Sequence, residues 1–269
     1  MVRVIDEEHR YSYSQLLSYT DCPFSYYLGY IEEPRPEEVT NAFAEQGTLI
    51  HDLLDKWAKG ELKKEELASE YERRYGDEVV TAFPRMLAAK GYAKKTYEQG
   101  LEYFETFTGF PGYSIVSAEE KYDMPILLTD GTTRPFIGFI DLVLRDDNTG
   151  GLVVCDHKSK SLATFKKDRK KMYKQQYLYS FFIHEKYGEW PTTLMFNLFK
   201  ELGYLDEEPF DMNTFEETMQ WATDSIHDIE DRSLLDWLEC KPLTKTGKPD
   251  FFCTSICSWR NVCSQAKAG

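Results

Sequence analysis

Apolar residues recur at two different spacings along the chain, which divides it into a helical first part and a strand-rich second part. Within residues 42–59 they follow the spacing of a helix with one buried face: Leu49, Ile50, Leu53, Leu54 and Trp57. Helical patterns also cover residues 11–30, 62–75, 79–90 and 92–107. The segment 109–114, GFPGYS, interrupts this pattern and indicates a boundary.

After this boundary the pattern becomes that of strands, which we expect at 115–128, 133–145, 151–158 and 192–201. TDGT (129–132) and DDNTGG (146–151) have the composition of hairpin turns. Long helices are expected at 164–187 and 213–239, and the tail 240–269 has little regular pattern. The order of elements therefore predicts an α/β fold with a central mixed sheet, flanking helices and helical additions at both ends.

The second and third expected strands bring two acidic residues together. If the turn between them is symmetric, Asp141 and Asp156 face each other with Cβ atoms about 4.5–5.5 Å apart. Lys158 lies two residues beyond Asp156 and so on the same face of the sheet. Both strands are apolar on both faces, which is typical of strands that are covered on both sides.

Two adjacent carboxylates in a covered sheet repel each other and are costly to desolvate, and a divalent cation relieves both effects. Oxygen ligands of this kind suit Mg²⁺ or Mn²⁺, and the ammonium of Lys158 could steady a developing negative charge. The alternative is an exposed hairpin end on which Asp156 and Lys158 form a surface pair. A β-bulge would also shift the register and separate the two acids.

Net charge and cysteine content limit which binding partners and which cellular compartment the sequence is compatible with. The net charge of −14 means that any surface for a polyanion is local, and the strongly basic run 166–174 is the candidate. No apolar stretch is long enough for a transmembrane helix, and the N-terminus lacks the apolar run of a signal peptide, so we expect a cytoplasmic protein without membrane partners. The six cysteines cluster, which in that compartment suggests metal before disulfide.

Asp141 followed by Asp156-x-Lys158 resembles the core of the PD-(D/E)xK nucleases. Three further segments resemble their RecB-like branch: the G-x-x-x-H helix GTLIHDLL, the Q-x-x-x-Y segment QQYLY and the start YSYSQLLSYTDCPFSYY. The match is closest to small CRISPR-associated RecB-like exonucleases and to phage exonucleases with a 4Fe-4S cluster. The resemblance implies a restriction-endonuclease-like core with a helical N-terminal block and a C-terminal Cys-rich metal-cluster segment.

The resemblance also implies roles for individual residues. His51, Asp141, Asp156 and the carbonyl of His157 would hold Mg²⁺ or Mn²⁺, and Lys158 would position or deprotonate the attacking water. Either Glu119 or Glu120 could add a carboxylate. Gln175 and Tyr179 would touch the DNA or the catalytic lysine.

The four cluster cysteines implied by the resemblance are Cys22, Cys253, Cys257 and Cys263. The gap between Cys253 and Cys257 is three residues, where the family usually has two. This departure leaves zinc, or participation of Cys240, as alternatives. Ligands from both ends of the chain would close a very long loop.

The expected protein is therefore a single nuclease domain, 1–269. Its parts are a helical segment 1–110 with the first cluster cysteine, a catalytic core 111–205, and a C-terminal helix and Cys-rich tail 206–269. The expected activity is metal-dependent exonucleolytic cleavage of DNA, at single-stranded ends by resemblance. The alternatives are a non-cleaving DNA-binding protein or partner in recombination or CRISPR adaptation, and a zinc-clasped interaction protein.

Overall fold

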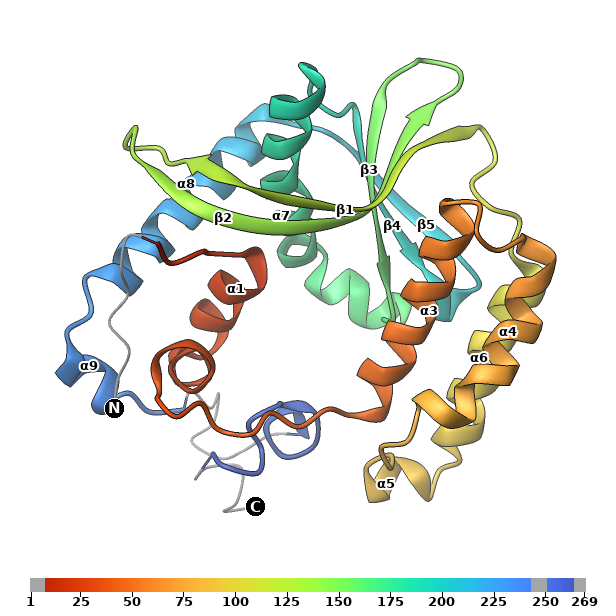
Figure 1. The fold of residues 1–269 in the computed structure, drawn as a ribbon, viewed down its shortest axis with the longest axis horizontal. Helices are drawn as coiled ribbons and strands as arrows, with labels where there is room; N and C mark the ends of the chain where they lie inside the picture. The colour runs from red at the N-terminus through yellow and green to blue at the C-terminus, as the bar shows by residue number, and fades with distance from the viewer. Residues whose placement is uncertain (1–7, 243–250, 264–269) are drawn as a thin grey trace. The chain divides into compact units, whose positions relative to one another are not determined.

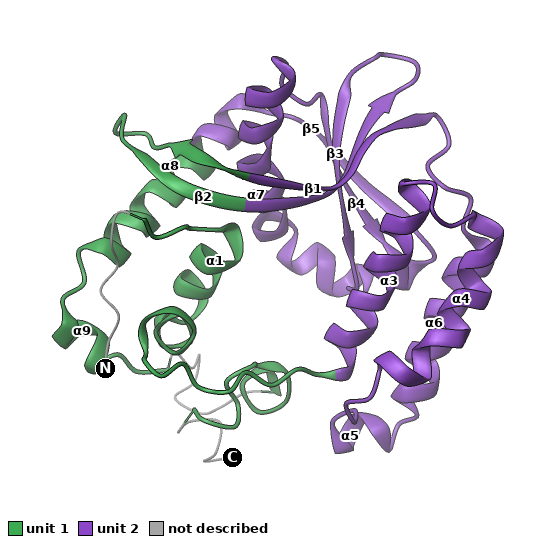
Figure 2. Cartoon of the chain, in the orientation of Figure 1, with its two compact units in different colours: residues 1–41, 123–137, 217–269 green, residues 42–122, 138–216 purple. Residues whose placement is uncertain are grey.

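The structure, a computed structural model, describes residues 8–242 and 251–263. It divides into two compact units (Figure 2), each assembled from separate stretches of the chain. Unit 1 comprises residues 1–41, 123–137 and 217–269, and unit 2 comprises residues 42–122 and 138–216. The division of a single nuclease domain at residues 110 and 205 stays a prediction, and parts of the expected Cys-rich tail lie outside the described residues.

Both units contain helices, and most of the strand residues belong to unit 2. In unit 1 the elements are α1 (Tyr13–Asp21), α2 (Pro23–Tyr26), η1 (Tyr27–Ile31), α9 (Leu234–Leu238) and η4 (Phe252–Ile256). In unit 2 they are α3 (Ala42–Ala58), η2 (Lys64–Glu66), α4 (Leu67–Glu78), α5 (Arg85–Ala88), α6 (Tyr92–Thr106), β3 (Leu152–Lys158), α7 (Leu162–Tyr187), β4 (Thr193–Leu198), η3 (Phe199–Glu201) and β5 (Tyr204–Pro209). Three elements contribute residues to both units: β1 (Tyr113–Leu127), β2 (Thr133–Asp146) and α8 (Met212–Glu230).

The sheet is mixed and has five strands in the order β1-β2-β3-β4-β5 (Figure 1). β2 and β3 are antiparallel, β3 and β4 are parallel, and β4 and β5 are antiparallel. α7 connects β3 to β4, as a parallel pair requires, and its first turn is capped by the side chain of Ser161. This architecture confirms the predicted α/β class with a central mixed sheet and flanking helices.

Side chains cover both faces of the part of the sheet that belongs to unit 2. One face contributes to a core cluster that partly buried Trp57 of α3 also contacts: Phe110, Leu142, Leu144, Val153, Cys155 and Met195. On the other face, the Phe196 ring lies 5.1 Å from the ring of Phe165 and 4.9 Å from that of Tyr173, both on α7. The strands are therefore buried on both sides, as their apolar sequences predicted.

A helical block made of α3, α4 and α6 has its own core, which buries the apolar stripe predicted for α3. Buried Gln46 of α3 donates hydrogen bonds to the Tyr71 hydroxyl on α4 (2.9 Å) and to the Thr96 carbonyl on α6 (2.6 Å). Gly100 allows this approach, because a Cβ there would lie 2.5 Å from Cζ of Tyr71. These contacts fix the rotation of α3 and with it the direction of His51.

Unit 1 is rich in buried tyrosines. Tyr11 and Tyr26 are 1% and 0% exposed, and Tyr11 pairs its backbone with that of Phe136 on β2. The Tyr11 hydroxyl donates to Glu230, which also accepts from Arg134 at 2.7 Å. These aromatic side chains therefore pack a core.

The structure differs from the expected elements in several places. The strand expected at 192–201 is shorter, because β4 ends at Leu198 and η3 follows. Only α5 is helical in the segment 79–90, because α4 ends at Glu78 and Pro84 precedes the next helical turn. The helix expected at 213–239 is two helices, since α9 begins anew with Ser233 and Asp236 as a capping box. The strand β5 was not predicted from the sequence.

Candidate metal centre and its surroundings

The hairpin of β2 and β3 has the register that a symmetric turn predicts. Leu142 pairs with Cys155 and Val143 with Val154, and the ladder ends at Leu142 and Cys155, the residues next to Asp141 and Asp156. The backbone N–H of His157 donates to Oδ2 of Asp141 at 2.8 Å. Asp156 is only 5% exposed, so the alternative of a solvent-exposed hairpin end is wrong for this residue.

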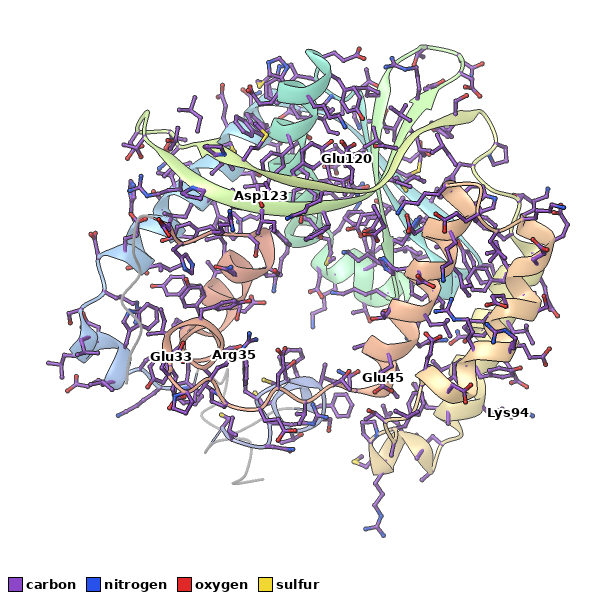
Figure 3. The ribbon with its side chains drawn as sticks, viewed as in Figure 1. Glu33, Arg35, Glu45, Lys94, Glu120 and Asp123 are labelled. Carbon is purple, nitrogen blue, oxygen red and sulfur yellow. The ribbon has the colours of Figure 1, made fainter. Side chains whose placement is uncertain are left out.

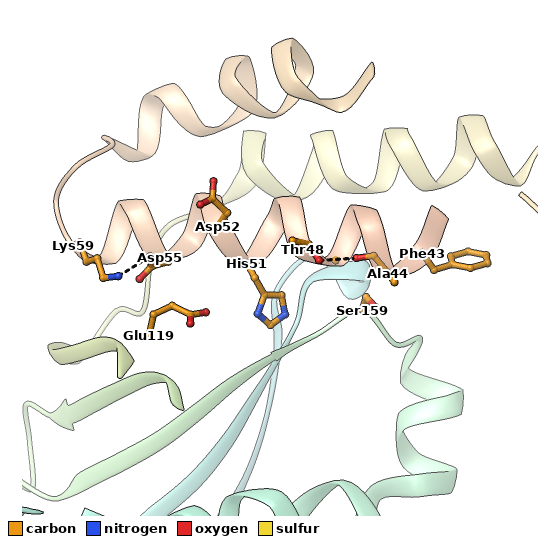
Figure 4. Close-up of a pocket in the computed structure, with 10 residues that line it drawn as sticks. Phe43, Ala44, Thr48, His51, Asp52, Asp55, Lys59, Glu119 and Ser159 are labelled. Atoms are coloured by element: carbon orange, nitrogen blue, oxygen red, sulfur yellow. Dashed lines mark hydrogen bonds and ion pairs between the residues drawn. The ribbon is translucent and has the colours of Figure 1, made fainter. Parts of the chain in front are cut away.

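His51 and Glu119 join Asp141 from two other elements. One ligand atom from each of these three residues lies within 4.8 Å of the others, and they are the only such group among the residues that the structure describes. Nδ1 of His51 is 3.3 Å from Oδ2 of Asp141. Figure 4 shows His51 pointing from α3 toward the strands, with Glu119 beside it. One nitrogen and two oxygen donors thus converge on one place.

The structure separates the two glutamates that the sequence could not distinguish. Glu119 has a backbone φ of 45°, a conformation that side-chain-bearing residues rarely adopt, and it belongs to the group around Asp141. Glu120, labelled in Figure 3, accepts from Ser117 at 2.7 Å and pairs with Lys186 of α7. Glu119 is therefore the candidate ligand, and its strained backbone is a feature that often accompanies functional sites.

The ionisable groups of the centre shift one another's pKa values. Burial raises the pKa of Asp156, and the charge of Asp141 raises it further against the opposing effect of Lys158. Burial alone would raise the pKa of Asp141, but the charge of His51, its hydrogen bond to Asp141 and the charge of Lys158 lower it overall. Burial, Asp141 and Asp55 raise the pKa of Glu119. Neighbouring acids whose pKa values are driven apart in this way form a crowded anionic site.

Lys158 is held on two sides. Its Nζ donates to Oδ1 of Asp156 at 3.0 Å and forms an ion pair with Oδ2 at 2.7 Å, and this buried Oδ2 has no other partner in the described part of the chain. The same Nζ donates to Oε1 of Gln175 on α7 at 3.1 Å. The predicted contact between the Q-x-x-x-Y segment and Lys158 is thus present through Gln175.

Tyr179 lies one turn further along α7 and is 7% exposed. Burial raises the pKa of its hydroxyl, and the charge of Asp156 raises it further. Gly138 of β2 makes room for the ring, because a Cβ there would lie 2.9 Å from Cε1 of Tyr179. The Tyr179 ring therefore packs against β2 at Gly138, and its hydroxyl is near enough to Asp156 to feel its charge.

The His157 side chain points away from the two aspartates, as the alternation along a strand predicted. Its Nδ1 lies 3.0 Å from Nδ2 of Asn197, which also donates to the Tyr103 hydroxyl at 2.8 Å. Burial lowers the pKa of His157 to about 3, so its ring is neutral. The imidazole is thus part of the packing beside His51, whose ring centroid is 5.6 Å away. That the His157 carbonyl is a metal ligand stays a prediction.

A cleft of about 610 Å³ opens beside the centre along one side of α3. Figure 4 shows the residues that line it: Phe43, Ala44, Gly47, Thr48, His51, Asp52, Asp55, Lys59, Glu119 and Ser159. Two of its acids already have cationic partners, since Asp52 contacts Lys56 at 2.8 Å and Asp55 contacts Lys59 at 2.8 Å. The cleft gives a ligand access to His51 and Glu119.

The cysteines of unit 1 gather from distant parts of the sequence. Burial raises the pKa of the Cys257 thiol, and the neighbouring thiols of Cys253, Cys263 and Cys22 raise it further. The other three predicted cluster cysteines therefore lie near enough to Cys257 to influence its thiol. Burial also raises the pKa of Cys240, with a contribution from Cys22, so this residue lies near the group as well.

Sequence reasoning left out two features of this region. The hydrogen-bonded set of Tyr103, Asn197 and His157 was not predicted, because each residue is one of many of its type and no spacing connects them. Lys200, two residues after the end of β4, was also missed, although a lysine so soon after a buried strand lies where α/β sheets bind ligands.

Comparison with known families gives one match, to the model described as the PD-(D/E)XK nuclease superfamily, over residues 10–264. The matched range includes the helical block, the whole sheet and all four predicted cluster cysteines. A search of curated proteins found no match. No helix in the described part of the chain is both long and apolar enough to span a membrane.

Proposed function

This chain belongs to the PD-(D/E)XK nuclease superfamily, and we propose that it is a Mg²⁺- or Mn²⁺-dependent deoxyribonuclease that degrades DNA from single-stranded ends. Membership of the superfamily indicates metal-dependent nuclease chemistry. The observation that supports an active enzyme is the convergence of His51, Glu119 and Asp141 next to the Asp156–Lys158 pair.

The residues present fit a divalent cation. Glu119 and Asp141 offer hard oxygen ligands, His51 offers a nitrogen, and Oδ2 of buried Asp156, which is paired only with Lys158, is a further acceptor among the described residues. When bound, the cation would polarise the scissile phosphate and stabilise the charge that develops on it. Burial and the charge of Asp141 raise the pKa of Asp156, and a cation held by these carboxylates would offset both effects.

Lys158 and Gln175 supply the remaining chemistry from the protein. Asp156 and Gln175 fix the ammonium group of Lys158 beside the carboxylates. From this position the ammonium can donate a hydrogen bond to the attacking water or to a phosphate oxygen, whose negative charge grows during the reaction. We therefore infer that His51, Glu119, Asp141 and Asp156 are ligands, that Lys158 is the catalytic residue and that Gln175 positions it.

A bound DNA strand would contact positively charged side chains near the start of α7. In the basic run 166–174, the exposed lysines are Lys166, Lys167, Lys170 and Lys171. Arg169 is already engaged, since it contacts Asp206 at 2.7 Å and also Glu208. Exposed lysines on one helix can neutralise phosphates locally in a protein whose overall charge opposes DNA. These lysines support DNA as the substrate.

We also propose that Cys22, Cys253, Cys257 and Cys263 hold a 4Fe-4S cluster. The support is that the thiols of Cys253, Cys263 and Cys22, which come from both ends of the chain, raise the pKa of the Cys257 thiol. A cluster there would tie the ends of unit 1 together, because metal–thiolate bonds close a long loop. The protein partners in recombination or CRISPR adaptation that the resemblance implies stay a prediction.

The nuclease proposal is tested with end-labelled single- and double-stranded DNA under Mg²⁺, Mn²⁺ or EDTA. We expect cation-dependent loss of nucleotides from single-stranded ends, and loss of at least about 10³-fold in rate for Lys158→Met. Lys94→Met is the matched control, because Lys94 lies on α6 with an 80% exposed side chain (Figure 3). Binding without cleavage by the unmodified protein would favour the non-cleaving DNA-binding alternative.

The cluster proposal is tested on protein purified without oxygen. We expect broad visible absorption and bound iron, and loss of both in Cys257→Ser. Cys240→Ser is the control, since Cys240 lies near the group but is not a proposed ligand. Bound zinc in a colourless protein would overturn the proposal in favour of a zinc clasp, and iron loss in Cys240→Ser would change the ligand set.

A further inference from the structure

Three side chains gather at one end of the cleft, away from the metal ligands. Phe43, in the first turn of α3, and Ser159, which follows β3, both line the cleft (Figure 4). Lys200, in η3, places its Nζ 4.7 Å from the centroid of the Phe43 ring. None of these residues has a role in the proposed catalytic centre.

Their position follows from the sheet topology. β3 and β4 are parallel, and Lys158 at the end of β3 pairs with Leu198 at the end of β4. The residues that follow, Ser159 and Lys200, therefore emerge at the same edge of the sheet. Ligands of open α/β sheets bind outside the carboxyl ends of the strands, which is where these residues lie.

The same edge is continuous with the candidate metal centre. The ring centroid of Phe199, the residue before Lys200, is 6.2 Å from that of His51. Ser159 follows Lys158, and a Cβ on Gly47 of α3 would lie 4.0 Å from its Oγ. A chain molecule in the cleft would thus meet His51 and the Lys200 end in succession.

Lys200 differs from the paired lysines of the cleft. Lys59 lies 2.8 Å from Asp55, whereas no described carboxylate forms an ion pair with Lys200. Burial lowers the pKa of Lys200 to about 8, so keeping its charge in this place costs stability. An anion beside the amine would offset this cost. The other end of the cleft carries Asp55 and Glu119, so a single phosphate fits at the Lys200 end.

We propose that Phe43, Ser159 and Lys200 form a subsite for the backbone phosphate of the DNA nucleotide next to the cleavage point. Lys200 contacts the phosphate, Ser159 donates a hydrogen bond to it, and Phe43 packs against the attached sugar or base. The subsite rests on the proposed nuclease function and names how the strand is held. It increases affinity for a chain of nucleotides and has no part in the bond-breaking step.

The first experiment compares Lys200→Met with the unmodified protein on two substrates. One is a single-stranded oligonucleotide, and the other is the p-nitrophenyl ester of thymidine 5′-monophosphate, which has one phosphodiester and does not reach the subsite. We expect KM for the oligonucleotide to rise about tenfold, with kcat and the rate on the ester unchanged. Lys200→Arg should restore most of the affinity, and Lys94→Met should change neither substrate.

The second experiment locates the phosphate. A series of oligonucleotides carries one neutral methylphosphonate each, at successive positions from the cleavage point. With the unmodified protein, the position next to cleavage should weaken binding about tenfold, and with Lys200→Met the same position should cause no further loss. Identical methylphosphonate profiles for the two proteins, or an unchanged KM in Lys200→Met, would overturn the subsite.

Failure of the nuclease function would be seen separately. If the unmodified protein cleaves neither substrate, fluorescence anisotropy with the same methylphosphonate series still measures affinity at each position. A loss of affinity that is confined to one position and absent in Lys200→Met would support the subsite in a non-cleaving DNA-binding protein. Equal affinities of the two proteins for every oligonucleotide would overturn it.

Discussion

Gln175 on α7 accepts a hydrogen bond from Lys158 at the end of β3, with Nζ and Oε1 3.1 Å apart. Asp156 contacts the same amine from within β3, so the amine has a carboxylate and an amide as fixed neighbours. A flexible lysine side chain would otherwise sample many positions. The two contacts together therefore define where its charge acts.

Removing the amide should slow the reaction without weakening substrate binding. For Gln175→Leu we expect kcat to fall by about 10–100-fold with KM unchanged, because a misplaced amine loses part of its stabilisation of the transition state. Gln175→Glu should restore part of kcat, since a carboxylate can also accept from the amine. Steady-state kinetics on end-labelled single-stranded DNA measures both parameters.

Gln220→Leu is the control for this change, because Gln220 is exposed on α8 and contacts Asp224. Unchanged melting temperatures in all three variants would show that the fold is intact. Full kcat in Gln175→Leu would mean that Asp156 alone holds Lys158, and the positioning role of Gln175 would be wrong.

Metal removal should lower the stability of the folded chain. A cation that binds the folded state alone stabilises it by about 2.7 kcal/mol at 100 times its Kd, so Mn²⁺ should raise the melting temperature by several degrees over EDTA. Asp141→Asn should abolish most of this rise, since it removes one charge from the group of His51, Glu119 and Asp141. Differential scanning calorimetry at fixed protein concentration is the measurement.

Asp147→Asn makes the same chemical change at an exposed position in the hairpin turn and should keep the full Mn²⁺ effect. An equal rise in melting temperature for Asp141→Asn and the unmodified protein would show that the cation binds elsewhere.

Gly138 should be sensitive to the smallest possible side chain. A Cβ at this position would lie 2.9 Å from Cε1 of Tyr179, which is buried and cannot move aside freely. We expect Gly138→Ala to destabilise the protein by about 1–3 kcal/mol through overpacking. Chemical unfolding followed by circular dichroism gives the free energy.

Gly76→Ala is the matched control, since nothing lies within 4 Å of the place that its new methyl group would take on α4, and it should be neutral or stabilising by up to about 1 kcal/mol. Combining Gly138→Ala with Tyr179→Leu should recover part of the loss. If Tyr179→Leu recovers none of the lost stability, contact with the Tyr179 ring is not the cause of the destabilisation in Gly138→Ala.

The sequence alone was sufficient to predict the register of the β2–β3 hairpin, because strand geometry is regular. Side chains alternate with a period of two, and the turn between Asp146 and Gly151 closes symmetrically, so the register of the two strands as far as the Leu142–Cys155 pair, beside Asp141 and Asp156, follows by counting. Gln175 could be placed near Lys158 only by resemblance, since the packing of α7 on the sheet has no such counting rule.

Other features depend on contacts that no local pattern encodes. The choice between Glu119 and Glu120 is made by a single backbone φ of 45°. β5 escaped prediction because it has few apolar residues, and two of its three acids, Asp206 and Glu208, are paired with Arg169 from α7. The burial of Lys200 is likewise a tertiary property, invisible among the 32 lysines and arginines of the chain.

The free-energy cost of burying the charged Lys200 amine should appear in the pH dependence of stability. The pKa of its amine is about 8 in the folded protein and about 10.4 when unfolded. Between pH 8 and 10.4 the amine binds its proton more tightly in the unfolded chain than in the folded protein. The contribution of Lys200 to the free energy of unfolding therefore rises with pH in this range. Below pH 8 the amine is charged in both states and the full cost remains. Lys200→Met should therefore stabilise the protein by about 1–3 kcal/mol at pH 7, and this gain should shrink between pH 8 and 10.

Urea unfolding of both proteins at a series of pH values measures the difference directly, and Lys94→Met controls for loss of an exposed positive charge. A gain that stays constant from pH 7 to 10 would mean that the amine is well solvated. A substitution that improves stability while weakening binding to an oligonucleotide would identify Lys200 as a residue kept for its ligand, because the described residues give its amine the Phe43 ring but no carboxylate partner.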